Sequence, residues 1–189
     1  MPRMRPPFAG PALAMALATL LPAPVPGADS RPNFSGTYAF APQKSDNLEA
    51  KIAAAVGSDY TVGSQKSEQA RVWIRGWLES VTEDSAKRIL TIEHTTTVFK
   101  SGMGDEVNIY YFGREATSRG PGGGNLKVTV AWKGGQIVTE GKEAKGKGRM
   151  TAVYTLQPGG KALLVEWRLE HGSMERPLEV RLAFDRVRE

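Results

Sequence analysis

Side chains able to do chemistry are few in this sequence. There is no cysteine, and the only histidines are His94 and His171. Without cysteine the chain can form neither a disulfide nor a soft-metal site, and its His, Asp and Glu residues lack the spacing of a metal centre. No serine stands in a nucleophile elbow. We therefore expect a protein that is not an enzyme, with no catalytic residue, no metal and no cofactor.

Glycine-rich and basic stretches are the remaining candidates for binding anions. Gly120–Gly124 follows no parallel strand and opens no helix, so it lacks the context of a phosphate-binding loop. Lys142, Lys145, Lys147 and Arg149 form a basic stretch, which is most simply a solvated hairpin tip. The alternative is peripheral contact with anionic lipid or an envelope polymer, where each cation near the surface contributes about 1 kcal/mol.

The first 28 residues are typical of an export signal. Two arginines precede the apolar run Phe8–Leu21, and the small residues Gly27 and Ala28 end the segment. This is the tripartite pattern of a secretory signal peptide, and the run falls short of the roughly 20 residues that span a bilayer. We expect residues 1–28 to be cleaved and residues 29–189 to form one domain in the periplasm or outside the cell.

That domain is only mildly basic. The whole chain has 25 Lys and Arg residues against 20 Asp and Glu residues, a formal net charge of +5. Removal of the first 28 residues takes away two arginines and no acid, which leaves +3. So small an excess of positive charge does not by itself indicate nucleic acid, and we expect no nucleic-acid partner.

The first folded element is predicted to be a strand that leads into a helix. Phe34–Ala41 alternates in hydropathy, with Tyr38 and Phe40 on its apolar face. Asp46 and Glu49 have the spacing of a capping box, which predicts a helix that begins at Asp46 and ends at Gly57.

A second, amphipathic helix is predicted over residues 67–81. Its apolar positions recur at i, i+3, i+4 and i+7, and its arginines take the other face. We expect the two helices to cap the structure between the first and second strands. The side chains predicted to form this cap, and a portal through it, are Trp73, Ile74, Trp77 and Leu78.

From Arg88 onward the hydropathy pattern has a period of two, which predicts strands. The pattern gives a long strand over Arg88–Lys100 and a hairpin turn at the paired glycines Gly134 and Gly135. About nine or ten amphipathic strands in a meander bury their apolar faces and protect their edges by closing into a barrel. We therefore predict a mainly β fold, a closed or nearly closed antiparallel barrel with the two-helix cap.

The order of one strand, two helices and a long meander resembles the fatty-acid-binding proteins of the calycin group, to which lipocalins also belong. Phe34-Ser35-Gly36-Thr37-Tyr38 is similar to the Phe-x-Gly-x-Trp start of that family, and Phe184-Asp185-Arg186 is similar to its aromatic-acid-base close. The same Phe-Ser-Gly-Thr-aromatic start also resembles small exported bacterial proteins. The resemblance implies a lipid-binding barrel.

One departure from that family concerns the ligand. Members that bind a carboxylate often place an arginine two residues before the closing aromatic, where this chain has Leu182. Arg181 is predicted to point outward, and a buried carboxylate without a partner costs several kcal/mol. If a ligand binds, we expect a neutral or weakly polar one.

The sequence thus predicts an exported, non-catalytic binding protein for a small hydrophobic ligand inside the barrel. The alternative is an envelope structural or interaction protein with a packed barrel that acts through its surface. His94 and Tyr154 are the predicted polar contacts, although His94, among threonines, is more simply a hydrogen-bonded barrel residue. The residues predicted to line the ligand site are Tyr38, Phe40, His94, Trp132, Tyr154, Trp167, Leu182 and Phe184.

Overall fold

The structure is a computed structural model that describes residues 31–56, 89–119, 125–144, 148–172 and 174–187. The chain divides into two units, Met1–Ser30 and Arg31–Glu189, and all described residues belong to the second. The predicted signal segment and the predicted second helix, with Trp73, Ile74, Trp77 and Leu78, lie outside the described residues. Both stay predictions.

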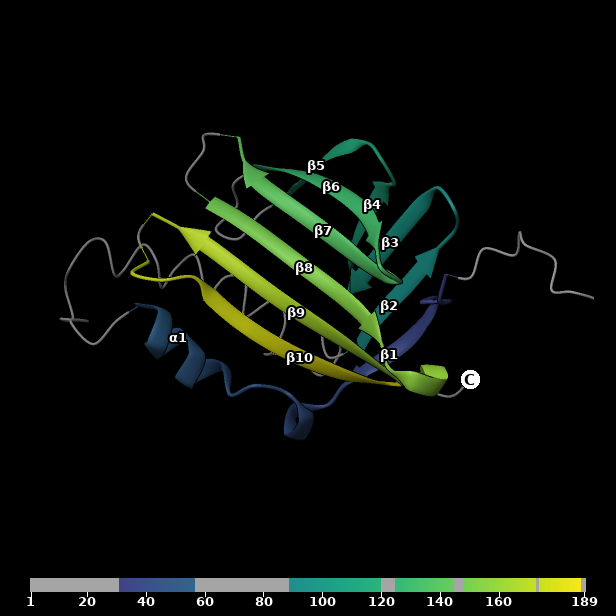
Figure 1. Cartoon of the computed structure of the whole chain (residues 1–189), viewed down its shortest axis with the longest axis horizontal. Coiled ribbons are helices and arrows are strands. Elements are labelled where there is room, and N and C mark those ends of the chain that lie inside the picture. Colours follow the sequence, from purple (N-terminus) through teal and green to yellow (C-terminus); the bar gives the residue numbers. More distant parts are fainter. Residues whose placement is uncertain (1–30, 57–88, 120–124, 145–147, 173, 188–189) are drawn as a thin grey trace, which may run out of the picture. The chain divides into compact units, whose positions relative to one another are not determined.

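Ten strands of the second unit form a single antiparallel sheet (Figure 1). Their order is β4-β3-β2-β1-β10-β9-β8-β7-β6-β5, a meander in which the first strand also pairs with the last. The strands are β1 (Gly36–Phe40), β2 (Ile89–His94), β3 (Val98–Met103), β4 (Glu106–Tyr111), β5 (Glu115–Arg119), β6 (Asn125–Lys133), β7 (Gln136–Glu143), β8 (Gly148–Leu156), β9 (Ala162–His171) and β10 (Leu178–Arg186).

The sheet closes on itself except at one seam, between β4 and β5. Side chains bridge that seam, since the Ser118 hydroxyl on β5 lies 2.8 Å from Asn108 Oδ1 and 3.3 Å from the Tyr110 hydroxyl on β4. The fold is therefore mainly β and a nearly closed antiparallel barrel, as the alternation of the sequence predicts.

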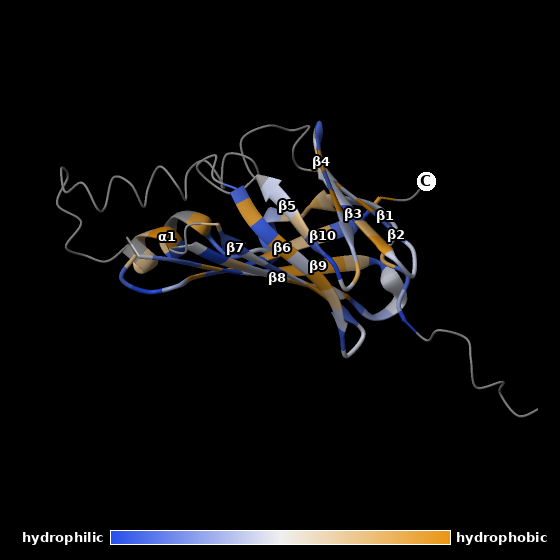
Figure 2. Ribbon diagram, turned by 90° about the horizontal axis from the view of Figure 1, so that it is seen from above, coloured by the Kyte–Doolittle hydropathy of each residue, from blue (hydrophilic) through white to orange (hydrophobic). Residues whose placement is uncertain are grey.

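Alternation decides which side chains enter the core. β6 alternates between exposed and buried residues over almost its whole length, and Figure 2 shows such alternation as orange and blue bands along the strands. Leu126, Val128 and Val130 are each 1% exposed, while the lysines of the same strand face water. The hairpin after β6 turns at Gly134 and Gly135, whose φ angles of 56° and 82° suit glycine.

One predicted strand is wrong. Arg88–Lys100 divides into β2 and β3, because the Thr95 side chain builds a tight turn between them. Thr95 Oγ1 accepts hydrogen bonds from the backbone N–H groups of Thr97 and Val98, and the Thr95 N–H donates to the Val98 carbonyl. A threonine hydroxyl can thus replace the ladder hydrogen bonds of a strand.

The described residues contain one α-helix, α1 (Leu48–Val56), so the predicted two-helix cap is not shown. Its N-cap is Asn47, whose side-chain oxygen accepts the Ala50 N–H at 3.0 Å. The prediction of Asp46 as N-cap is wrong, because the Asp46 carboxylate instead accepts the backbone N–H of Arg181 on β10 at 2.9 Å. The helix packs against the core through the side chains of Leu48, Ile52 and Ala55.

α1 lies beside the first half of β10 (Figure 1). The pairing of β1 with β10 ends at Phe40, and the short 3₁₀ helix Pro42–Lys44 follows soon after it. Beyond this helix, side chains accept hydrogen bonds from the backbone of β10. Ser45 Oγ accepts the Ala183 N–H and donates to the Ala41 carbonyl, both at 2.9 Å. We call the end of the barrel at which α1 lies the α1 end.

Candidate functional site

The eight residues predicted to line a ligand site all belong to the core or pack against it. Tyr38 and Leu182 are 0% exposed, Phe184 is 1% exposed and Tyr154 is 5% exposed. Phe40, Trp132 and Trp167 are partly buried against the same core. Leu182 faces inward and Arg181 faces water, the orientations that the alternation predicts.

His94 and Trp132 belong to an aromatic cluster at the end of the barrel opposite α1. The Trp132 ring contacts the rings of Phe34, His94 and Phe112, with centroid distances of 5.7, 5.6 and 5.6 Å. The Arg31 guanidinium lies 5.4 Å from the Trp132 ring centroid. Phe34 is fully buried at the centre of this cluster, which we call the aromatic plug.

His94 accepts a hydrogen bond from the segment just before β1 and so fixes that segment in the aromatic plug. Its Nε2 accepts the Phe34 N–H at 2.9 Å, so the neutral ring carries its proton on Nδ1. Nδ1 of His94 and Nε1 of Trp132 are buried without a hydrogen-bond partner among the described residues. His94 thus already has a structural partner, and the plug closes this end.

The inward-facing cation near this end is also engaged. The Arg186 guanidinium donates to the Ser35 carbonyl and, at 3.2 Å, to the Gly160 carbonyl, and it lies 5.2 Å from the Tyr38 ring centroid. Burial raises the pKa of Tyr38, and the nearby Arg186 opposes that shift. Because its N–H groups bond backbone carbonyls, Arg186 stabilises the junction of β1 and β10.

An uncharged polar cluster lies inside the barrel, built from Ser101, Asn108, Tyr110, Ser118 and Tyr154. Ser118 bonds Asn108 and Tyr110 across the seam, and the nearby Ser101 hydroxyl opposes the rise in the pKa of Tyr154. Burial, reinforced by the neighbouring Tyr110, raises the pKa of Tyr154, and burial also raises the pKa of Tyr110. Both phenols are therefore neutral hydrogen-bonding groups at physiological pH.

The sequence analysis found only Tyr154 in this cluster. The missed signal is in β4, where Asn108 and the 8% exposed Tyr110 face inward and the apolar residues face water. Val107, Ile109 and Tyr111 are 60%, 48% and 48% exposed. Tyr111 therefore faces water. A strand that exposes its apolar side and buries polar side chains departs from the usual arrangement, which is a signal for function.

The inward-facing side chains differ in how far they are buried. The interior from the aromatic plug to the middle of the barrel is buried, since Phe99, Ile137, Leu163 and Leu182 are all 0% exposed, and Leu169 and Leu178 near α1 are also 0% exposed. Trp167 differs, because its neighbours Ala152 and Val180 across the ladders are 0% and 2% exposed while Trp167 itself is partly exposed. Met103 and Met150, toward the α1 end, are also inward-facing and partly exposed.

We call Met103, Met150 and Trp167 the partly exposed wall. Asn108 and Ser118, the less buried members of the polar cluster, also keep some exposed surface, whereas Tyr110 and Tyr154 are buried. The described interior thus combines fully buried side chains with three partly exposed apolar ones, those of the partly exposed wall. Hydroxyl and amide groups without net charge face the same interior.

No metal centre or membrane-crossing helix is found in the described part of the chain. There, no three His, Asp or Glu side chains are grouped to hold a metal ion. Among the same residues no helix has the length and hydropathy to cross a bilayer.

Comparison with known proteins gives structural resemblances only. No protein-family model matches the sequence, and neither does any curated protein. The REP1-NXSQ fatty acid transporter is similar at 15% identity and a TM-score of 0.49, over 82% of this chain and 96% of that one. Apo lipid binding protein 8 of Caenorhabditis elegans is similar at 16% identity and a TM-score of 0.49, over 82% of this chain and 95% of that one. The assignment as a nearly closed ten-stranded antiparallel barrel rests on the strand order and register of this chain itself.

Proposed function

We propose that this protein is a non-catalytic binding protein for a small hydrophobic ligand that carries an uncharged polar group. The observation that supports the proposal most directly is the partial exposure of Trp167 between fully buried neighbours. A large, partly exposed aromatic side chain that faces a barrel interior is suited to contact an apolar ligand. The ligand's apolar part would lie against the partly exposed wall.

The polar cluster indicates which head group the ligand has. Asn108, Tyr110 and Ser118 offer hydroxyl and amide groups, which can donate to an ester or ketone oxygen and can both donate to and accept from an alcohol. Among the described residues an ionised carboxylate at the same place would lack a cation, since Leu182 stands where an arginine would serve and Arg186 bonds backbone carbonyls. Burial of an unpaired charge costs several kcal/mol, so a neutral head group is favoured.

The expected place of action is outside the cytoplasm. Residues 1–28 have the pattern of a cleaved signal peptide, which supports export to the periplasm or the medium. A carrier for a poorly soluble compound is useful in an aqueous compartment, because the barrel shields the apolar surface of the ligand from water.

A tryptophan-fluorescence titration tests the proposal, and the same titration of Trp167→Phe shows how much of the signal comes from Trp167 among the four tryptophans. A long-chain alcohol and the fatty acid of equal length are compared at a pH where the acid is ionised. We expect saturable binding of the alcohol and weaker binding of the acid. Absence of saturable binding, or equal affinity for the ionised acid, would contradict the proposal.

Two adjacent tyrosines provide a matched pair of variants. Tyr110→Phe removes an inward hydroxyl of the polar cluster, and Tyr111→Phe removes an outward one by the same chemical change. Loss of one hydrogen bond to the ligand costs about 0.5–1.5 kcal/mol, so the alcohol should bind roughly two- to tenfold more weakly to Tyr110→Phe. Tyr111→Phe should bind it unchanged.

The second candidate is a barrel that acts through its outer surface. It is favoured by the apolar residues Val107, Ile109 and Tyr111, which are about half exposed or more on one strand. Exposed apolar patches of this kind often mark interaction sites. Failure of every lipophilic probe to bind, together with a loss of self-association or partner binding in Ile109→Ser, would favour this candidate.

A further inference from the structure

Cations stand side by side on the outer face of β6, β7 and β8. The register pairs Lys127 with Lys142 and Lys142 with Arg149, and the next residue in this row is Glu170 on β9. Like charges directly opposite each other destabilise a sheet. A row of three neighbouring cations is therefore an arrangement that folding alone does not favour.

Lys142 and Arg149 differ from three other cations of the outer face, each of which has an acidic partner. Lys100 pairs with Glu93 at 2.9 Å, Lys127 with Glu115 at 2.9 Å and Lys133 with Glu140 at 2.7 Å. Within the described ranges, neither Lys142 nor Arg149 has an ion pair or a side-chain hydrogen bond.

Two of the nearby acids bond other cations. Glu170 bonds Arg168 at 2.9 Å, and Glu140 bonds Lys133. Lys133 and, to a smaller extent, the charge of Lys142 hold the pKa of Glu140 below its usual range. Glu143 lies beside Gly148, since a Cβ added to that glycine would approach the Glu143 side chain to 2.8 Å. The cationic pair is thus left available for an anion from outside the chain.

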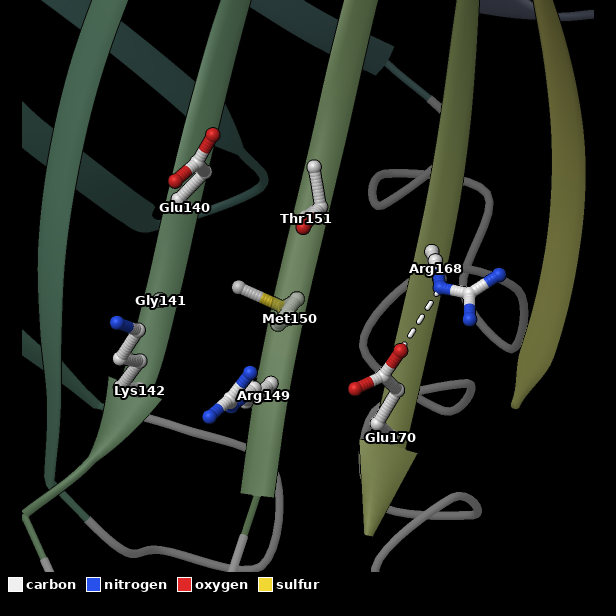
Figure 3. Close-up of a pocket in the computed structure, with 8 residues that line it drawn as sticks. All are labelled: Glu140, Gly141, Lys142, Arg149, Met150, Thr151, Arg168 and Glu170. Carbon is white, nitrogen blue, oxygen red and sulfur yellow. Dashed lines mark hydrogen bonds and ion pairs between the residues drawn. The ribbon is translucent and has the colours of Figure 1, made fainter. Parts of the chain in front are cut away.

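A depression of about 320 Å³ lies at these residues. Figure 3 shows the Arg149 side chain extending toward β7, where Lys142 lies, and shows Arg168 turned to Glu170 on the other side. The Thr151 side chain also lines the depression and adds a hydroxyl.

We propose that Lys142 and Arg149 form a binding site for a phosphate group on the outer face of the barrel. The planar guanidinium can bond two phosphate oxygens, and the ammonium adds a compact charge beside it. An anion between them also removes the repulsion between the facing cations. The site lies outside the barrel interior, so it is independent of the proposed ligand site.

The test compares the double variant Lys142→Gln/Arg149→Gln with Lys100→Gln/Lys133→Gln, which changes the net charge equally. Unfolding temperatures are measured in phosphate and in chloride at equal ionic strength, and phosphate binding is measured by calorimetry. We expect phosphate to raise the unfolding temperature of the unchanged chain and of the Lys100/Lys133 variant. In the Lys142/Arg149 variant this rise should vanish and affinity should fall about tenfold or more, since two charge-assisted hydrogen-bond donors are lost.

A second measurement distinguishes the source of the phosphate. Vesicles of phosphatidylglycerol and of phosphatidylcholine are sedimented with each variant. Retention of the unchanged chain on phosphatidylglycerol, lost only in Lys142→Gln/Arg149→Gln, would identify a lipid head group. Binding of inorganic phosphate alone would identify a soluble phosphate compound.

A general effect of charge would overturn the proposal. It would appear as equal losses in both double variants, or as phosphate and vesicle responses that persist in Lys142→Gln/Arg149→Gln. In chloride, Lys142→Gln should unfold at the same temperature as the unchanged chain or a higher one, because it removes a repulsion. Lys133→Gln, which loses an ion pair, should not gain stability.

Discussion

Replacement of Leu182 by alanine tests the division of the interior into a packed middle and a partly exposed wall. Leu182 is 0% exposed, and its ladder neighbour Val165 is 1% exposed. The flanking inward residues Val180 and Phe184 are 2% and 1% exposed. These neighbours are held in strands and cannot collapse into the space, so Leu182→Ala should lower the free energy of unfolding by about 3–4 kcal/mol.

Met103→Ala is the matched change in the partly exposed wall. Met103 has a side chain of similar size and also faces inward, but part of its surface is already free. Its truncation removes less buried area and leaves no closed cavity, so we expect a loss of about 1 kcal/mol. The contrast between the two variants, about 2–3 kcal/mol, measures the difference in packing.

Urea unfolding followed by circular dichroism provides the measurement, with the slope of the transition checked for each variant. Leu182→Met serves as control, because a volume-conserving change in the core should cost less than about 1.5 kcal/mol. Equal losses in Leu182→Ala and Met103→Ala would refute the reasoning. The interior would then be packed to the same density at both places.

Further outcomes follow from single side chains. Ser45→Ala leaves the Ala183 N–H without its acceptor and should cost about 1–3 kcal/mol, measured by the same urea unfolding. The folded-state pKa of Tyr154 is raised by burial, so its contribution to stability is present below the unfolded pKa of about 10 and is lost as the pH rises above it. Tyr154→Phe should therefore reduce the loss of stability above about pH 10 in a series of unfolding measurements. Gly135→Ala places a side chain at a φ of 82° and should cost about 1–2 kcal/mol, whereas unchanged stability would show that the turn can shift.

The strand pattern was the most predictable part of the fold. In β6 every second side chain is buried, and a period of two in the sequence is enough to show it. The same reasoning correctly gives Leu182 an inward position and Arg181 an outward one. These predictions succeed because the orientation of a strand residue depends only on its neighbours in the chain.

Competing side-chain hydrogen bonds explain the local errors. Thr95 interrupts a run that reads as one long strand, because its hydroxyl bonds the backbone N–H groups of Thr97 and Val98. Asp46 has the spacing of a helix cap, but the open edge of β10 beyond β1 offers it the Arg181 N–H, and Asn47 becomes the cap. Propensity cannot decide between two acceptors when the donor comes from a distant strand.

The sequence by itself determined the period of the strands, the glycine turn at Gly134 and Gly135 and the absence of cysteine chemistry, because each depends on residue type and near neighbours. Only the tertiary structure decided which inward residues meet. Ser101, Tyr110, Ser118 and Tyr154 come from different strands, and they form one polar cluster only because the sheet closes on itself. The row of Lys127, Lys142 and Arg149 likewise depends on register, and a shift by one residue would turn these side chains to the other face of the sheet.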